Sequence, residues 1–161
     1  MTNDDYTLDD EATFNDALQL RDAGNLAGAI AILEELARRR PRKASVVGML
    51  AGMQLDVGDF AGSPRNATTA VELAPRSDLA SRILFHALFG VGDVVGAFRE
   101  AARFRSLKES NEYDRILIEM EADTLCDLQS KPNDPFLIEL LGHVRAEISV
   151  RPVTQSIRRD P

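Results

Sequence analysis

"AGNLAGAIAIL", residues 23–33, returns in altered form as "VGDFAGSPRNA", residues 57–67, and as "VGDVVGAFREA", residues 91–101. The second residue of each copy is a glycine, the third is Asn or Asp, and the fourth is apolar. The three glycines follow one another at intervals of 34 residues; they are Gly24, Gly58 and Gly92. A single Gly-Asp pair is a common turn, but two equal intervals of this length indicate an internal repeat.

Prolines support the same period. Pro41 and Pro75 each stand 17 residues after the glycine of their copy, and the third copy has Glu109 at the equivalent place. A period of 34 residues accommodates a helix of about four turns, a tight turn and a second such helix. Glycine ends the first helix because it adopts the left-handed conformation at no steric cost, and the Asn or Asp caps the second. Proline cannot continue a helix and therefore closes the unit.

The repeat predicts an all-α chain built from antiparallel helix pairs, each of which must stack on a neighbour to bury its apolar stripe. Pro64 is tolerated in the first turn of a helix, so we expect the fourth helix to start late or to kink. The helices expected from the repeat are 10–23, 26–39, 43–57, 60–73, 78–91 and 94–107.

Beyond the repeats, apolar residues at helical spacing predict a seventh helix within 111–129, and "PFLIELLGHVRAEISV" at 135–150 predicts an eighth. We expect these two helices, within 110–150, to cap the repeats. Residues 1–9 are expected to form an acidic N-terminal tail and residues 151–161 a polar C-terminal tail.

The pattern resembles the tetratricopeptide repeat (TPR) family, in three divergent copies at about 10–43, 44–77 and 78–111. The residues that carry the resemblance are Gly24, Asn25, Leu26, Ala29 and Pro41; Gly58, Asp59, Phe60, Ala67, Ala70 and Pro75; and Gly92, Asp93, Val94, Ala97 and Ala101. The large aromatic residue that the family has early in the first helix is replaced by Thr13, Val47 and Ser81. The resemblance implies a TPR-like helix-turn-helix solenoid, a right-handed superhelix of about eight helices.

In this family the first helix of each pair lines a concave groove that binds a peptide or protein. The residues that the resemblance places on this face are Phe14, Leu18, Arg21, Ser45, Gly48, Gly52, Leu55, Leu79, Arg82, His86 and Phe89. Gly48 and Gly52 stand in a helical stretch where each costs about 1 kcal/mol relative to alanine. They have two interpretations: they deepen the groove, or they allow two helices to pack closely. The lysines and asparagines of the family's clamp for heat-shock chaperone peptides are absent here, so we expect a segment with apolar anchors instead.

The composition limits the functional classes to which the protein can belong. The 161 residues carry a formal net charge of −7, which disfavours general nucleic-acid binding. Cys126 is the single cysteine, so no internal disulfide forms and a reducing compartment is expected. The acidic N-terminus is no secretion signal, and the longest apolar stretch is too short to cross a bilayer. We therefore expect a soluble cytoplasmic protein that makes no membrane contact.

Side chains that could act in catalysis or bind a metal form no catalytic or metal-binding pattern in the sequence. His86 and His143 lack partners at metal-ligand spacing, and Cys126 is expected to pack against neighbouring leucines. The basic run Arg38–Lys43 is interpreted as a solvated helix end, with contact to an acidic partner or to nucleic acid as alternatives. We expect no cofactor, no metal and no enzymatic activity.

The sequence therefore favours a bacterial, non-enzymatic interaction module that serves as an adaptor, chaperone or neutralising protein. Size, acidity and three repeats look like the translocator chaperones of type III secretion, and a toxin immunity protein is a further alternative. Two alternatives come from other functional classes. One is an enzyme that uses His86, and the other is a protein that binds nucleic acid or an acidic partner weakly through Arg38–Lys43. Self-association of the chain stays open.

Overall fold

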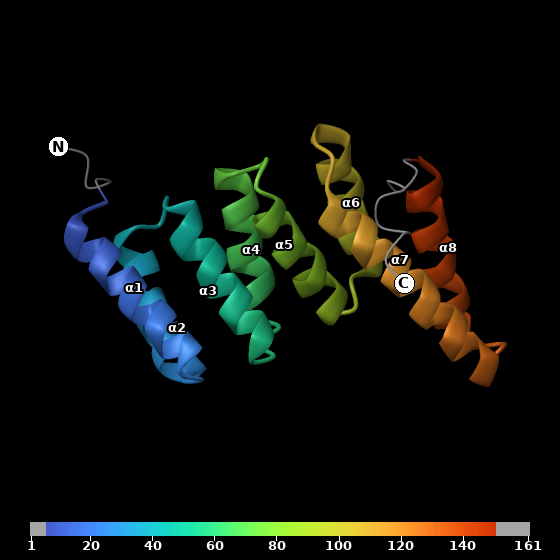
Figure 1. Ribbon diagram of the computed structural model, residues 1–161, viewed down its shortest axis with the longest axis horizontal. Coiled ribbons are helices and arrows are strands. Elements are labelled where there is room, and N and C mark those ends of the chain that lie inside the picture. Colours follow the sequence, from blue (N-terminus) through green and yellow to red (C-terminus); the bar gives the residue numbers. More distant parts are fainter. Residues whose placement is uncertain (1–5, 151–161) are drawn as a thin grey trace. The chain divides into compact units, whose positions relative to one another are not determined.

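The computed structural model describes residues 6–150, and this part of the chain consists of eight helices with no strand (Figure 1). The helices are α1 (Leu8–Asp22), α2 (Leu26–Arg39), α3 (Ala44–Asp56), α4 (Gly62–Leu73), α5 (Asp78–Gly90), α6 (Val94–Leu107), α7 (Asn111–Ser130) and α8 (Pro135–Val150). Of the expected N-terminal tail, residues 1–5 lie outside the described residues, whereas Leu8 and Asp9 belong to α1. The expected C-terminal tail, 151–161, lies outside them entirely.

The six helices expected from the repeat are all present, with ends that differ from the prediction by at most two residues. The start of α4 at Gly62 confirms the late start expected from Pro64. Pro64 is the third residue of this helix, where a backbone N–H would have no intrahelical partner. The proline therefore costs α4 no hydrogen bond.

The repeated glycines make the turns within the helix pairs. Gly24, Gly58 and Gly92 have φ values of +80°, +75° and +82°, and they are the glycines with positive φ in the described part of the chain. The Asn25 Oδ1 atom then accepts a hydrogen bond from the Gly28 N–H at 3.0 Å and so caps α2. These contacts confirm the turn and the cap that the repeat predicts.

The helices form two compact units, the first ending at Asp93 and the second beginning at Val94. The division falls inside the expected third repeat, between α5 and α6. In the first unit each helix from α1 to α4 packs against the next one, and α3 also packs against α5. In the second unit α8 packs against both α6 and α7.

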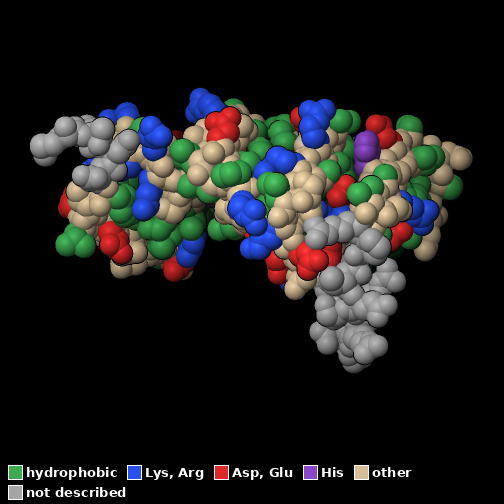
Figure 2. Space-filling model, turned by 90° about the horizontal axis from the view of Figure 1, so that it is seen from above, with side chains coloured by type: hydrophobic (Ala, Val, Ile, Leu, Met, Phe, Trp, Pro, Cys, Tyr) green, Lys and Arg blue, Asp and Glu red, His purple; other side chains and the backbone are tan. Residues whose placement is uncertain are grey.

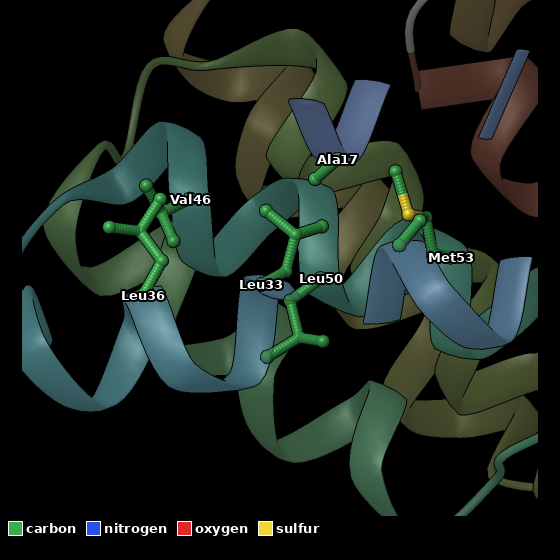
Figure 3. Close-up of a cluster of buried hydrophobic side chains, with 7 residues drawn as sticks. Ala17, Leu33, Leu36, Val46, Leu50 and Met53 are labelled. Carbon is green, nitrogen blue, oxygen red and sulfur yellow. The ribbon is translucent and has the colours of Figure 1, made fainter. Parts of the chain in front are cut away.

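The core of the first unit consists of two clusters of buried side chains. One cluster joins α1, α2 and α3 (Figure 3): Ala17, Ala29, Leu33, Leu36, Val46, Leu50 and Met53. The other joins α3, α4 and α5: Val47, Ala51, Ala67, Ala70, Val71, Ala80 and Leu84. Alanines at the helix crossings allow the backbones to approach, and larger aliphatic side chains fill the space beside them.

The second unit combines an aromatic contact with a buried ion-pair network. The rings of Phe104 and Tyr113, both fully buried, lie 5.8 Å apart between centroids. Arg105 is 2% exposed, and its guanidinium lies 3.1 Å from Asp114 Oδ1 and 2.7 Å from Glu147 Oε1. The guanidinium also donates to the Glu147 carbonyl at 2.9 Å. One arginine on α6 thus connects α7 and α8.

None of the helices between residues 6 and 150 combines the length and the apolar character that a bilayer-spanning helix needs.

Candidate functional site

The first unit contains an open, largely apolar pocket with a volume of about 310 Å³. One lining residue comes from α1, four come from the first half of α3, two come from the loop between α4 and α5, and three come from the first half of α5. The lining residues are Phe14, Ala44, Ser45, Gly48, Met49, Ala74, Ser77, Leu79, Ala80 and Ile83. The pocket therefore lies where the first helices of successive pairs meet.

Helical spacing places the lining residues of α3 on one wall of the pocket. Ser45, Gly48 and Met49 are separated by three and four residues and so share a face of α3. Phe14, on α1, packs against the first core cluster, which holds its ring in position. Leu79 is 53% exposed although it is a large apolar side chain, because it stands at the mouth of the pocket. The wall thus keeps apolar surface in contact with solvent.

Gly48 and Gly52, the two glycines expected on the groove face, have different surroundings. Gly48 is buried and lines the pocket, and a Cβ atom added there would lie 3.5 Å from the Ala70 Cβ atom of α4, an ordinary contact. Gly52 does not line the pocket, and a Cβ atom added there would lie 3.4 Å from Ile83 Cδ1 of α5. Each glycine therefore faces a neighbouring helix, α4 at Gly48 and α5 at Gly52, and Gly48 also lines the pocket.

Of the side chains predicted to face the groove, Phe14, Ser45, Gly48 and Leu79 line the pocket. Arg21 lies beside it, because its guanidinium is 3.6 Å from Sδ of the lining residue Met49. The other predicted residues are outside the pocket: Leu18 packs against the first core cluster, Leu55 is half-buried, Arg82 pairs with Asp78, His86 is at the surface and Phe89 stacks on Phe85.

Two charged side chains of α5 pair with each other within the helix. The Arg82 Nε atom lies 2.6 Å from Asp78 Oδ2, one turn earlier on the same helix. Desolvation by the surrounding protein, followed by the positive charge of Arg82, lowers the pKa of His86 below its ordinary value of 6.5.

Sequence reasoning missed Ala44, Met49, Ala74, Ser77, Ala80 and Ile83. Met49 and Ile83 are one helical turn after Ser45 and Leu79, so an i, i+4 row from these two predicted residues identifies them. Ala74 and Ser77 lie at helix ends, and nothing in a helical periodicity points to them. The groove residues expected from the resemblance instead include Gly52 on α3 and His86 on α5. These two residues lie on a different line along their helices from Met49 and Ile83.

The basic run Arg38–Lys43 is largely engaged with other side chains of the first unit. Arg38 pairs with Glu35, and Arg40 Nε lies 2.7 Å from Asp10 Oδ2. The Lys43 ammonium lies 4.2 Å from the centroid of the Tyr6 ring. Arg38 and Arg39 thus belong to the last turn of α2, as expected of a helix end, whereas Arg40 is 16% exposed and pairs with Asp10, so this part of the run is not solvated.

The remaining candidates from the sequence are a metal-binding cluster, Cys126 and His143. Within residues 6–150, no three His, Cys, Asp or Glu side chains are placed to hold a metal ion. Cys126 is exposed, which corrects the expectation that it packs against its neighbouring leucines. His143 stacks on Phe98 of the same unit, with 5.3 Å between ring centroids.

Comparisons with known proteins agree with this architecture. No protein-family model matches the chain, and no curated protein matches its sequence. The chain is similar in structure to a double mutant of MamA (MamA RS-1 ArsTM), a TPR-containing protein, with a TM-score of 0.61. The match covers 96% of this chain and 80% of that one, at 14% sequence identity. The chain accordingly has an all-α, TPR-like fold.

Proposed function

We propose that this chain is a non-enzymatic interaction module whose first unit holds a segment of a partner protein in the pocket between α1, α3 and α5. The observation that carries the proposal is an open apolar pocket at which Leu79 remains 53% exposed. Exposed apolar surface that is concave and bordered by polar residues is typical of sites that bind another molecule. The TPR-like fold supports a protein partner, because stacked helix pairs present extended surfaces for this purpose.

A pair of matched substitutions tests the proposal. Leu79→Asp puts a charge at the mouth of the pocket, at the second residue of α5. Phe136→Asp makes the corresponding change at the second residue of α8, where the side chain is 51% exposed and belongs to the other unit. Both substitutions remove an exposed apolar side chain and add an acidic residue to a first helical turn, where it is tolerated.

The wild type and the two variants are immobilised and used to capture partners from a lysate of the source organism, and melting curves verify that each is folded. We expect a partner that the wild type and Phe136→Asp retain and that Leu79→Asp loses. If all three proteins capture the same set in the same amounts, the pocket is not the binding site and the proposal fails.

A further inference from the structure

The last helix of the second unit, α8, has one buried face and one exposed face. Leu140, Val144 and Glu147 follow one another at helical spacing and are buried, on the side from which α8 packs against α6 and α7. The residues on the opposite side are all exposed, and we call them the outer face of α8; they are Pro135, Ile138, Glu139, Gly142, Arg145, Ala146 and Ser149. Figure 2 shows hydrophobic side chains at the surface over α7 and α8, interspersed with acidic and basic ones.

The outer face keeps a large apolar side chain in contact with solvent. Ile138 is 53% exposed, and helical spacing puts it in one row with Gly142 and Ala146 along the middle of the face. In stacked-helix proteins, a terminal helix needs a polar outer face to stay soluble without a neighbour. The uncharged row on α8 departs from this rule, and a second helix that covers the row accounts for the departure.

The outer face is symmetrical about Gly142. Glu139 comes three residues before it and Arg145 three residues after it, whereas Ile138 and Ala146 are four residues before and after. Two antiparallel copies of α8 that cross at Gly142 therefore bring Glu139 of each copy level with Arg145 of the other. They also bring Ile138 of each copy level with Ala146 of the other. The face is thus complementary to itself under a twofold axis, as a closed dimer requires.

Both charged groups are accessible to a second copy. The Glu139 side chain is 68% exposed, and its Oε1 atom lies 3.7 Å from His143 Nε2. The Arg145 side chain is 55% exposed, and its Nε atom lies 2.9 Å from Glu121 Oε1 of α7. A guanidinium has five N–H donors, so the contact with Glu121 leaves donors for a second carboxylate. Apart from the helix around Gly142, no atom lies within 4 Å of the Cβ position there, so another helix can approach closely.

We propose that the outer face of α8 binds the outer face of a second copy of this chain, with the two α8 helices antiparallel about a twofold axis at Gly142. Two Glu139–Arg145 ion pairs fix the direction and register of the helices, and burial of Ile138 supplies most of the affinity. A single pair of helices buries less area than a standard interface, which spans about 1,200–2,000 Å². We therefore expect a dimer that dissociates in the micromolar range. The dimer is independent of the proposed function, because the pocket belongs to the first unit.

Sedimentation velocity of the full chain, at concentrations from about 1 µM to about 200 µM, tests the proposal. We expect the average mass to rise from the monomer value toward twice that value. Ile138→Asp should raise the dimer Kd at least about tenfold. Phe136→Asp is the matched control, because Phe136 is 51% exposed and lies about 160° around α8 from Ile138. The control should leave the Kd within about twofold of the wild type, and melting curves verify that each variant is folded.

Exchange of the two charges tests the antiparallel arrangement. Glu139→Arg and Arg145→Glu each place like charges level with one another in the dimer, so each variant alone should stay monomeric. Mixed in equal amounts, the two variants should form a heterodimer, because each cation of one outer face is then level with an anion of the other. Glu119→Arg, on α7, is the matched control, since its side chain is 66% exposed and its charge change equals that of Glu139→Arg. This control should dimerise as the wild type does.

The outcomes that contradict the dimer are distinct. A wild type that stays monomeric over the whole range would overturn the proposal, and so would a dimer whose Kd is unchanged in Ile138→Asp. Folded charge variants that dimerise alone, or that fail to associate when mixed, would overturn it as well, and this mixing experiment decides by itself if Ile138→Asp does not fold. A dimer that Leu79→Asp converts to monomer and Ile138→Asp does not would locate the contact at the pocket. A monomeric wild type that captures a lysate protein through Ile138 would identify another protein as the occupant and would overturn the proposal.

Discussion

At the scale of single residues, the glycines of this chain serve two distinct purposes. Gly24 ends α1 in the left-handed region, with its N–H donating to the Arg21 carbonyl at 2.8 Å. Gly48 has ordinary helical geometry in α3 and leaves part of the pocket wall without a side chain. Glycine is therefore required by backbone conformation at Gly24, whereas at Gly48 an added Cβ atom would make only an ordinary contact with Ala70 of α4.

We predict that Gly24→Ala destabilises the first unit by about 1–2 kcal/mol, the cost of holding an L-residue in the left-handed region. Apart from the adjacent residues of the chain, no atom lies within 4 Å of the Cβ position, so no clash with the rest of the protein adds to this cost. The free energy of unfolding, measured by urea denaturation followed by circular dichroism, gives the value. An unchanged free energy would mean that the turn adopts another conformation.

Gly48→Ala is the matched control within the same unit. We expect this variant to be more stable than the wild type by about 0.5–1 kcal/mol, because alanine is favoured in a helix interior. The added Cβ atom meets Ala70 Cβ at 3.5 Å, which needs no rearrangement. A loss of stability would show that α3 and α4 pack too closely for any side chain at this position.

At the scale of helices, Asp10 connects the start of α1 to the region between α2 and α3. The Thr7 N–H donates to Asp10 Oδ2 at 3.0 Å, and the Asp10 N–H donates to Thr7 Oγ1 at 3.2 Å, which forms a capping box. The same carboxylate receives Arg40 at 2.7 Å and Arg39 at 3.2 Å. The hydrogen bond from the Thr7 backbone, followed by those from the Thr7 side chain and Arg40, lowers the pKa of Asp10 despite the opposing effect of burial.

This lowered pKa predicts a pH-dependent contribution to stability. A carboxyl group whose pKa is lower in the folded state contributes fully above its unfolded value, near 3.8, and loses the contribution as the pH falls through the folded value. Asp10→Asn should therefore lower the urea midpoint at neutral pH, and the difference from wild type should diminish below pH 3.8. A difference that is constant across the acid range would mean that the carboxylate charge has no part in the stabilisation.

In the second unit, Arg105 plays the corresponding role for α6, α7 and α8. We predict that Arg105→Ala destabilises this unit by about 3–5 kcal/mol, because it leaves Asp114 and Glu147 buried without the cation that compensates them. Urea denaturation measures the loss. The double substitution Asp114→Asn/Glu147→Gln in the Arg105→Ala background should recover part of the stability, and a failure to recover any would attribute the loss to the cavity left by the arginine.

At the scale of the whole molecule, the net charge of −7 opposes binding to nucleic acid. The basic run Arg38–Lys43 does not offset it, because Arg40 and Lys43 contact Asp10 and Tyr6. We predict no retardation of a random DNA duplex in a gel-shift assay at about 0.15 M salt. Retardation that weakens steeply with added salt and disappears in Arg38→Glu/Arg42→Glu would contradict this prediction and would support the nucleic-acid alternative.

Part of the candidate site was predictable from the sequence. The resemblance to TPR proteins placed Phe14, Ser45 and Leu79 on one face, and all three line the pocket. It also placed His86 and Phe89 there, and these lie elsewhere. The side chains of α5 that face α3 depend on how this helix packs, and Ala80 and Leu84 belong to the core cluster that fixes this packing. Such packing is a property of several helices at once.

The sequence by itself determined where each helix begins and ends. Turn glycines such as Gly24, caps such as Asn25 and the position of Pro64 act through hydrogen bonds and steric limits within a few residues. Only the tertiary structure decided which side chains meet across long separations, as when Asp10 meets Arg40 from 30 residues away and Arg105 meets Glu147 from 42 residues away. The pocket belongs to this second group, because its walls come from α1, α3 and α5 and exist only when these helices pack.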